Sequence, residues 1–81
     1  MSDRHAKNVV LYTRAGCHLC DDAAELLRVH GLAPQLIDID ADPALCAAHH
    51  EWVPVVEIDG VIRFRGRIEP VLLRRLLADA N

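Results

Sequence analysis

The sequence predicts an α/β fold, with a four-stranded mixed sheet, helices on both faces and the element order β-α-β-α-β-β-α. Three observations lead to this prediction. Short apolar runs alternate with segments of helical periodicity through the first half of the chain. Two later apolar runs are joined directly by Asp59-Gly60, a strong hairpin signal. An amphipathic segment then closes the chain. At 81 residues, we expect a single domain over residues 1–81.

The first half supplies two strands and two helices. Residues 8–13 read as a buried strand because their apolar side chains follow one another without a break. Residues 18–30 read as a helix that stops at Gly31, since their apolar residues recur at helical spacing. Leu36–Ile39 forms the second predicted strand. Asp42-Pro43 then opens a short helix, with an N-cap carboxylate followed by a proline at the first helical position.

The second half supplies a hairpin and a closing helix. Val55–Ile58 and Val61–Phe64 read as its two strands, and residues 68–80 read as an amphipathic helix. Helical segments connect the first three strands, so we expect these strands to be parallel and the last pair to be antiparallel. The second helix is then expected on the opposite face of the sheet from the first.

Composition narrows the function classes. Apolar residues make up 52% of the chain, enough for a core, and the formal net charge of −3 argues against nucleic-acid or membrane-surface binding. No apolar run approaches the roughly 20 residues that span a bilayer. The polar start Met1-Ser2-Asp3-Arg4-His5 lacks a signal-peptide core. We therefore expect a cytoplasmic protein, and a monomer. The three cysteines exclude a fully paired disulfide framework within one chain.

Cys17-His18-Leu19-Cys20 is the motif that carries chemistry. It ends a strand and opens a helix, so the first sulfur is expected at the helix N-terminus, where unpaired N–H groups and the helix dipole favour a thiolate. Cys20 follows one turn later, within reach of a mixed disulfide formed on Cys17. This arrangement suits reversible dithiol–disulfide exchange, and in a cytosolic protein a CxxC is typical of catalytic or metal-binding sites. The two acidic residues that follow, Asp21 and Asp22, oppose a nearby thiolate.

Two segments carry a resemblance to a known family. They are residues 12–20, Tyr-Thr-Arg-Ala-Gly-Cys-His-Leu-Cys, and residues 53–56, Val-Pro-Val-Val, in that order along the chain. From about Val9 to Leu77 the chain resembles glutaredoxin-like members of the thioredoxin superfamily. It is especially similar to short bacterial proteins with a C-x-L-C motif followed by acidic residues. The resemblance implies the thioredoxin fold and thiol–disulfide oxidoreductase activity.

The resemblance also implies residue roles. Cys17 would be the nucleophile and Cys20 the resolving thiol. Arg14 stands where glutaredoxins usually carry a lysine that meets a glutathione carboxylate. Val53-Pro54 matches the superfamily's cis-proline motif, and the Val53 backbone would then pair with an extended thiol substrate. His18 is a further candidate: protonated, it would support the thiolate, and otherwise it faces solvent.

The sequence departs from glutaredoxins after the last strand. Their Gly-Gly pair and following acid, which hold the γ-glutamyl end of glutathione, are replaced by a single glycine and a candidate acid, Glu69. Three alternating arginines nearby, Arg63, Arg65 and Arg67, provide either a cationic surface for an acidic partner or a solvated edge that discourages sheet pairing. We therefore expect weak dependence on glutathione as co-substrate and no bound cofactor. Protein or small-molecule disulfides and a thioredoxin-type reductase are the expected partners.

Two other functions stay open at this point. One is a metal or iron–sulfur module, for which glutaredoxin-type folds that use a single cysteine with glutathione are a precedent by resemblance; the retained Cys20 and the incomplete glutathione site weigh against it. Cys17 and Cys20 with Cys46 and His49 would also make a Cys₃His zinc set. A helix after the CxxC, and a second helix on the opposite face, weigh against that set, so we expect no metal site and a half-buried core position for Cys46. The other is a thioredoxin-fold interaction domain without catalytic turnover.

Overall fold

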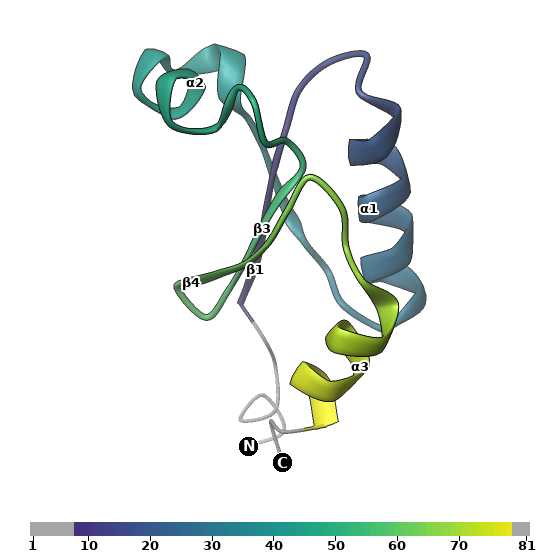
Figure 1. The fold of residues 1–81 in the computed structure, drawn as a ribbon. Coiled ribbons are helices and arrows are strands. Elements are labelled where there is room, and N and C mark those ends of the chain that lie inside the picture. The colour runs from purple at the N-terminus through teal and green to yellow at the C-terminus, as the bar shows by residue number, and fades with distance from the viewer. Residues whose placement is uncertain (1–7, 79–81) are drawn as a thin grey trace.

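The structure, a computed structural model that describes residues 8–78, has the predicted order of strands and helices (Figure 1). One short 3-10 helix, η2, is added between the second strand and the second helix. The elements are β1 (Val9–Thr13), α1 (His18–Val29), β2 (Gln35–Asp38), η2 (Ile39–Ala41), α2 (Pro43–His49), β3 (Val55–Ile58), β4 (Val61–Arg65) and α3 (Pro70–Ala78). The predicted extension of the last helix to residue 80 lies partly outside the described residues.

The four strands form one mixed sheet in the order β2-β1-β3-β4. β1 is parallel to β2, and β3 is antiparallel to both β1 and β4. The expectation of three parallel strands is therefore wrong for β3. The reason is the seven-residue α2, which at about 1.5 Å per residue is too short to lead the chain back along the sheet. The chain stays at the end where β1 and β2 finish, so β3 starts beside Tyr12 and runs back.

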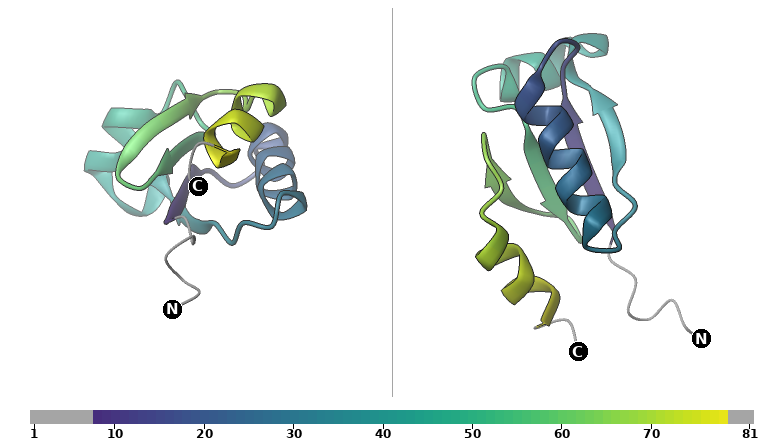
Figure 2. Two further views of the ribbon diagram at one scale, coloured as in Figure 1. Left: turned by 90° about the horizontal axis from the view of Figure 1, so that it is seen from below. Right: turned by 90° about the vertical axis from the view of Figure 1, so that its right-hand side faces the viewer.

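The main core lies between one face of the sheet and the two longer helices. α1 and α3 both supply side chains to it, whereas α2 lies on the other side of the sheet (Figures 1 and 2). Its fully buried members come from two strands and both helices: Leu11, Leu27, Val56 and Leu73. Within residues 8–78, no helix is both long and apolar enough to cross a membrane.

The second face of the sheet is covered by α2 only near the end of β1. There the Tyr12 and His49 rings lie 4.7 Å apart between centroids. The Tyr12 hydroxyl donates to Glu57 Oε1 of β3 at 3.2 Å. Burial and the neighbouring Glu57 carboxylate raise the pKa of Tyr12. The Tyr12–His49 contact places α2 at one end of the sheet, the end from which the chain enters β3.

Replacing Leu27 by alanine should destabilise the protein by about 2–5 kcal/mol, the cost of removing a fully buried leucine side chain. Leu27 is 0% exposed on the core side of α1. Val29→Ala is the control, because Val29 lies on the same helix but is 69% exposed, and its effect should stay within about 0.5 kcal/mol. Urea unfolding of both variants measures the difference. Equal losses would show that α1 does not anchor the core.

Candidate active site

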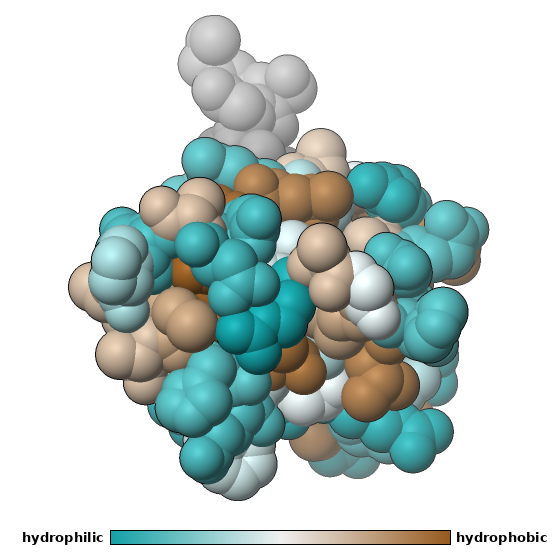
Figure 3. All heavy atoms as spheres, turned by 90° about the horizontal axis from the view of Figure 1, so that it is seen from above, coloured by the Kyte–Doolittle hydropathy of each residue, from teal (hydrophilic) through white to brown (hydrophobic). Residues whose placement is uncertain are grey.

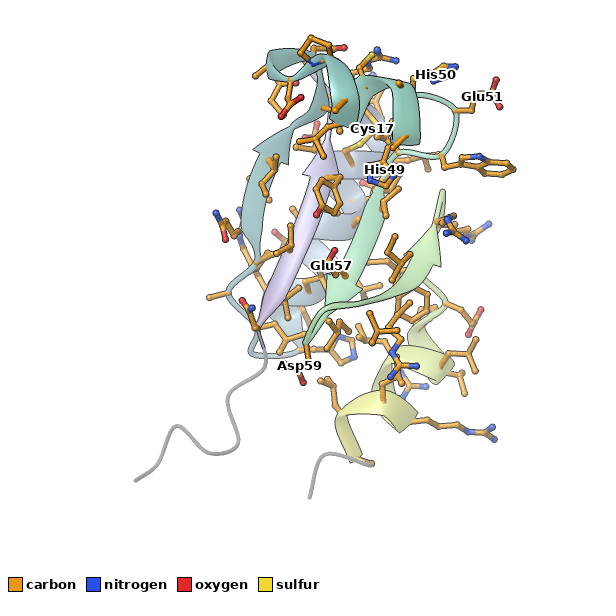
Figure 4. The ribbon with its side chains drawn as sticks, turned by 90° about the vertical axis from the view of Figure 1, so that its left-hand side faces the viewer. Cys17, His49, His50, Glu51, Glu57 and Asp59 are labelled. Carbon is orange, nitrogen blue, oxygen red and sulfur yellow. A yellow bond between two sulfur atoms is a disulfide. The ribbon has the colours of Figure 1, made fainter. Side chains whose placement is uncertain are left out.

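Cys17 and Cys20 lie at the start of α1 and are joined in a disulfide, with their Cα atoms 5.2 Å apart (Figure 4). Cys17 is the N-cap residue, and its sulfur accepts a hydrogen bond from the Cys20 backbone N–H at 3.1 Å. The preceding turn is closed by the Cys17 N–H, which donates to the Arg14 carbonyl at 3.3 Å. Gly16 has a φ of +78°, which side-chain-bearing residues rarely adopt. The turn therefore delivers the first sulfur to the helix N-terminus, as predicted.

The two sulfurs differ in exposure. Cys17 is half-buried, whereas Cys20 is 1% exposed and packed within the protein. An incoming sulfur can therefore approach Cys17 but not Cys20. The backbone N–H group and the helix N-terminus both favour negative charge on the Cys17 sulfur once the disulfide is reduced. Asp21, the acid in the first turn of α1, opposes that charge.

The loop before β3 reaches the same end of the sheet, since Val55 pairs with Tyr12 near the end of β1. The Val53–Pro54 peptide bond is cis, which confirms the prediction. Pro54 is buried and Val53 half-buried. The Gly66 N–H, from the turn after β4, donates at 2.7 Å to the carbonyls of both Trp52 and Pro54. One backbone donor thus fastens the loop before β3 to the turn before α3.

Arg14 lies in an ion pair that the sequence analysis did not foresee. Its Nε and Nη2 donate to the two carboxylate oxygens of Asp40 at 2.9 and 2.7 Å. Nη2 also contacts the Cys46 sulfur at 3.5 Å, and that thiol donates to Asp40 at 3.6 Å. The hydrogen bonds from Arg14 lower the pKa of Asp40, and in return the Asp40 carboxylate raises the pKa of Arg14.

The parallel pairing of β1 with β2 explains this ion pair. Thr13 pairs with Asp38, so the residues that follow the two strand ends come close together. The parallel pairing of these two strands was the sequence signal that could have indicated the contact between Arg14 and Asp40, which are 26 residues apart. Cys46 is half-buried, as expected, but its sulfur faces Arg14 and Asp40.

The remaining predicted residues are more dispersed. His18 is exposed on the first turn of α1. His49 is half-buried against Tyr12. The cysteines and His49 of the considered zinc set are therefore engaged separately. In the described part of the chain, no group of three or more His, Cys, Asp or Glu side chains is arranged to hold a metal ion.

A groove of about 350 Å³ lies between α1 and the turn before α3, and its lining begins at Leu19 in the cysteine motif. Its walls are Leu19, Asp22, Ala23 and Leu26 on one side and Gly66, Arg67 and Ile68 on the other. Two large apolar side chains are exposed here: Leu19, within the cysteine motif, at 54%, and Trp52, directly before the Val53-Pro54 motif, at 53%. Figure 3 views this end of the molecule and shows apolar patches among hydrophilic atoms. This surface therefore offers both apolar and charged contacts next to the cysteine pair.

Glu69, the candidate acid after the last strand, is used in capping. Its Oε1 accepts the Val71 N–H at 3.0 Å at the start of α3. The single glycine of this turn, Gly66, has a φ of +80°, and the bulky Arg67 follows it. The turn thus differs in chemistry from the glycine-pair turn of glutaredoxins.

Comparisons with known proteins agree with this geometry. A structural-genomics target protein from X. campestris is 36% identical, with a TM-score of 0.74 and coverage of 90% of this chain and 99% of that one. A glutaredoxin from Archaeoglobus fulgidus is 20% identical, with a TM-score of 0.64 and coverage of 86% and 85%. A mutant thioredoxin-like protein is 23% identical, with a TM-score of 0.64 and coverage of 86% and 99%. The last two likenesses concern the fold alone.

No curated protein matches the chain. A family match covers most of the chain: the glutaredoxin-like domain family (DUF836) matches residues 8–78. That span is the whole described part of the molecule and includes both cysteines, the cis-proline loop and all four strands. The chain therefore belongs to the glutaredoxin-like domain family.

Proposed function

We propose that this protein is a thiol–disulfide oxidoreductase in which Cys17 is the nucleophile and Cys20 the resolving thiol. One observation carries the proposal: a half-buried and a fully buried cysteine share a disulfide at the start of a helix. Membership of a glutaredoxin-like family supports a redox function in general terms. The difference in exposure supports this division of roles, since Cys17 is half-buried and Cys20 is buried.

The reaction begins with the reduced dithiol. The Cys17 thiolate attacks one sulfur of a substrate disulfide, the substrate S–S bond breaks, and the departing thiolate takes up a proton. Cys20 then loses its proton and attacks the Cys17 sulfur, which releases the second substrate thiol and forms the Cys17–Cys20 disulfide. The substrate gains two electrons and the protein loses two. An external dithiol or thiol must return them to complete a cycle.

The helix N-terminus assists both the oxidation of the dithiol and the reduction of the disulfide. The Cys20 N–H, 3.1 Å from the Cys17 sulfur, stabilises the attacking thiolate. When an external thiol reduces the disulfide, it attacks the exposed Cys17 and Cys20 leaves first. The same donor then favours Cys17 as the leaving thiolate in the second exchange, which frees the reduced protein. The nearby Asp21 moderates this stabilisation, because its carboxylate repels a charged sulfur.

The loop at Val53 and Pro54 and the groove beside α1 are the proposed substrate contacts. An extended substrate segment would pair with the Val53 backbone, as the family resemblance implies. The groove of about 350 Å³ is at the small end of ligand pockets, so it suits one or two substrate side chains. We therefore propose protein disulfides as substrates and a thioredoxin-type reductase as an electron donor, in the cytoplasm.

Glutathione is proposed as a weak co-substrate. One edge of the Arg14 guanidinium, formed by Nε and Nη2, is already directed at Asp40. A glutathione carboxylate must therefore compete with a tethered one for the same guanidinium. Glu69 is held in the α3 cap, and Arg67 replaces the second glycine of the turn. These three features each weaken a contact that glutathione would otherwise make.

Brief alkylation of the fully reduced protein with iodoacetamide should modify Cys17 first. Cys17 combines exposure with stabilisation of the thiolate, whereas Cys20 is buried and the Cys46 sulfur is in contact with Arg14 and Asp40. Mass mapping of peptides after a short reaction measures the order of labelling. Preferential labelling of Cys46 would overturn the site assignment.

Cys20→Ser should yield a protein that accumulates a mixed disulfide with a substrate, whereas Cys17→Ser should abolish exchange. The first variant keeps the exposed nucleophile and loses the thiol that releases it. Cys46→Ser is the control and should retain exchange. Non-reducing electrophoresis after mixing with an oxidised protein substrate detects the trapped species. If Cys17→Ser kept most of the wild-type rate, the proposed mechanism would have to be abandoned.

Asp40→Asn should tighten the binding of S-methylglutathione by about two- to fivefold, the range expected from one exposed ion pair. Removing the Asp40 charge frees Arg14 for the ligand's glycyl carboxylate. The glycine ethyl ester of the same ligand should gain nothing. Asp59→Asn changes the charge equally at the opposite end of the sheet from Cys17 and serves as the control (Figure 4). Equal gains for the acid and its ester, measured by calorimetry, would contradict the competition.

A further inference from the structure

Charge is divided unevenly along this chain. Residues 61–78 carry five arginines and a single acidic residue, whereas residues 8–60 carry nine acidic residues and only two basic ones, histidines aside. The arginine-rich segment comprises β4, the turn after it and α3. A protein with a negative net charge thus presents a concentrated basic surface on one part of its fold.

A second groove lies within this basic segment, away from the cysteine pair. It measures about 230 Å³ and runs between β4 and α3. β4 contributes Arg63 and Phe64, and α3 contributes Leu72, Arg75 and Leu76, which share one helix face. The groove lining therefore combines apolar residues with one arginine from each element. It is smaller than the roughly 300–1,000 Å³ of small-molecule pockets, which suits a single apolar side chain.

The groove adjoins a sheet edge. β4 is the outermost strand in the order β2-β1-β3-β4, so one of its sides presents backbone groups that a further strand can pair with. Extended peptides commonly bind proteins by adding a strand to such an edge. Arginine side chains are well suited to pairing with carboxylates across such a contact.

We propose that β4 and α3 form a docking surface for an acidic polypeptide segment that carries one large apolar residue. The segment lies along the β4 edge, its apolar side chain enters the groove, and its carboxylates meet Arg63 and Arg75. This surface is distinct from the dithiol site and does not depend on redox chemistry. It gives the domain a means of selecting a partner protein in addition to reacting with its disulfide.

Other occupants fit the surface less well. Single-stranded nucleic acid stacks its bases on exposed aromatic rings, but Phe64 is only 7% exposed. A membrane requires a protruding apolar face, whereas this site is a groove whose lining includes two arginines. A second copy would present its acidic residues from a different part of its surface. Such a head-to-tail contact would build a ring or an open filament rather than a twofold dimer.

Phe64 is the only phenylalanine of the chain, so 4-fluorophenylalanine incorporation places one fluorine nucleus in the groove of the full-length protein. The probe is a short synthetic peptide of Glu and Asp with a single central leucine. Titration should shift the fluorine resonance and saturate. A peptide with serine in place of leucine, and one with lysine in place of the acids, should bind at least about tenfold more weakly.

The matched variants distinguish binding at the groove from attraction to the overall charge of the protein. Arg63→Glu/Arg75→Glu should weaken binding of the acidic peptide by about tenfold or more at low salt. Arg28→Glu/Arg74→Glu changes the net charge equally outside the groove and should retain most of the affinity. Circular dichroism confirms that both variants are folded, and the assay needs no turnover, so a failure of the proposed redox function leaves its outcome unaffected.

Three results would overturn the docking surface. They are equal loss of affinity in the two double variants, tighter binding of single-stranded DNA or anionic phospholipid vesicles than of the peptide, and concentration-dependent self-association that the Arg63→Glu/Arg75→Glu change abolishes. The last would assign the groove to a second copy of the chain. Saturation of the fluorine shift by the acidic peptide, lost in the groove variant alone, is the supporting result.

Discussion

The packing of α1 against β1 and β3 positions almost everything else in this molecule. Leu27 from the helix joins Leu11 and Val56 from the strands in a seam from which water is fully excluded. A helix fixed along the sheet in this way must begin at the end of the sheet where β1 finishes. The Cys17 sulfur is consequently held at the N-terminus of a helix that is packed against the sheet. The chemistry of the thiol pair therefore depends on an apolar contact that other residues make.

The same end of the sheet gathers three segments that are distant in sequence. The turn after β1 brings the cysteines, η2 brings Asp40, and the loop before β3 brings the cis-proline. The first two have opposite electrostatic effects. The helix N-terminus favours an anion on Cys17, whereas Asp40 neutralises the cation that follows β1. The site is thus prepared for a charged sulfur but offers little net positive charge to a charged substrate. This balance favours recognition of a substrate through backbone and apolar contacts over recognition of its carboxylates.

Local sequence signals predicted the features that depend on local geometry. Asp59-Gly60 predicted the hairpin, because both residues adopt positive φ there, and the cysteine spacing predicted the start of α1. Contacts between distant segments were harder to predict. The direction of β3 depends on where α2 packs, and its stacking through His49 leaves no periodic pattern in the sequence. Nothing near Asp40 in sequence indicates a contact with Arg14. The strand register alone brings those two side chains together.

Gly66 limits the sequences that this domain can accept. A Cβ at this position would meet nothing within 4 Å, so crowding does not demand the glycine. The demand comes from the backbone, since φ is +80° and the N–H is shared by two carbonyls. Proline cannot supply that donor, and other residues are strained at that torsion. Because the neighbouring space is open and belongs to the groove beside α1, an alanine there would narrow the groove as well as strain the turn. Substitutions at position 66 should thus be rare among related sequences, even though the residue bears no reactive group.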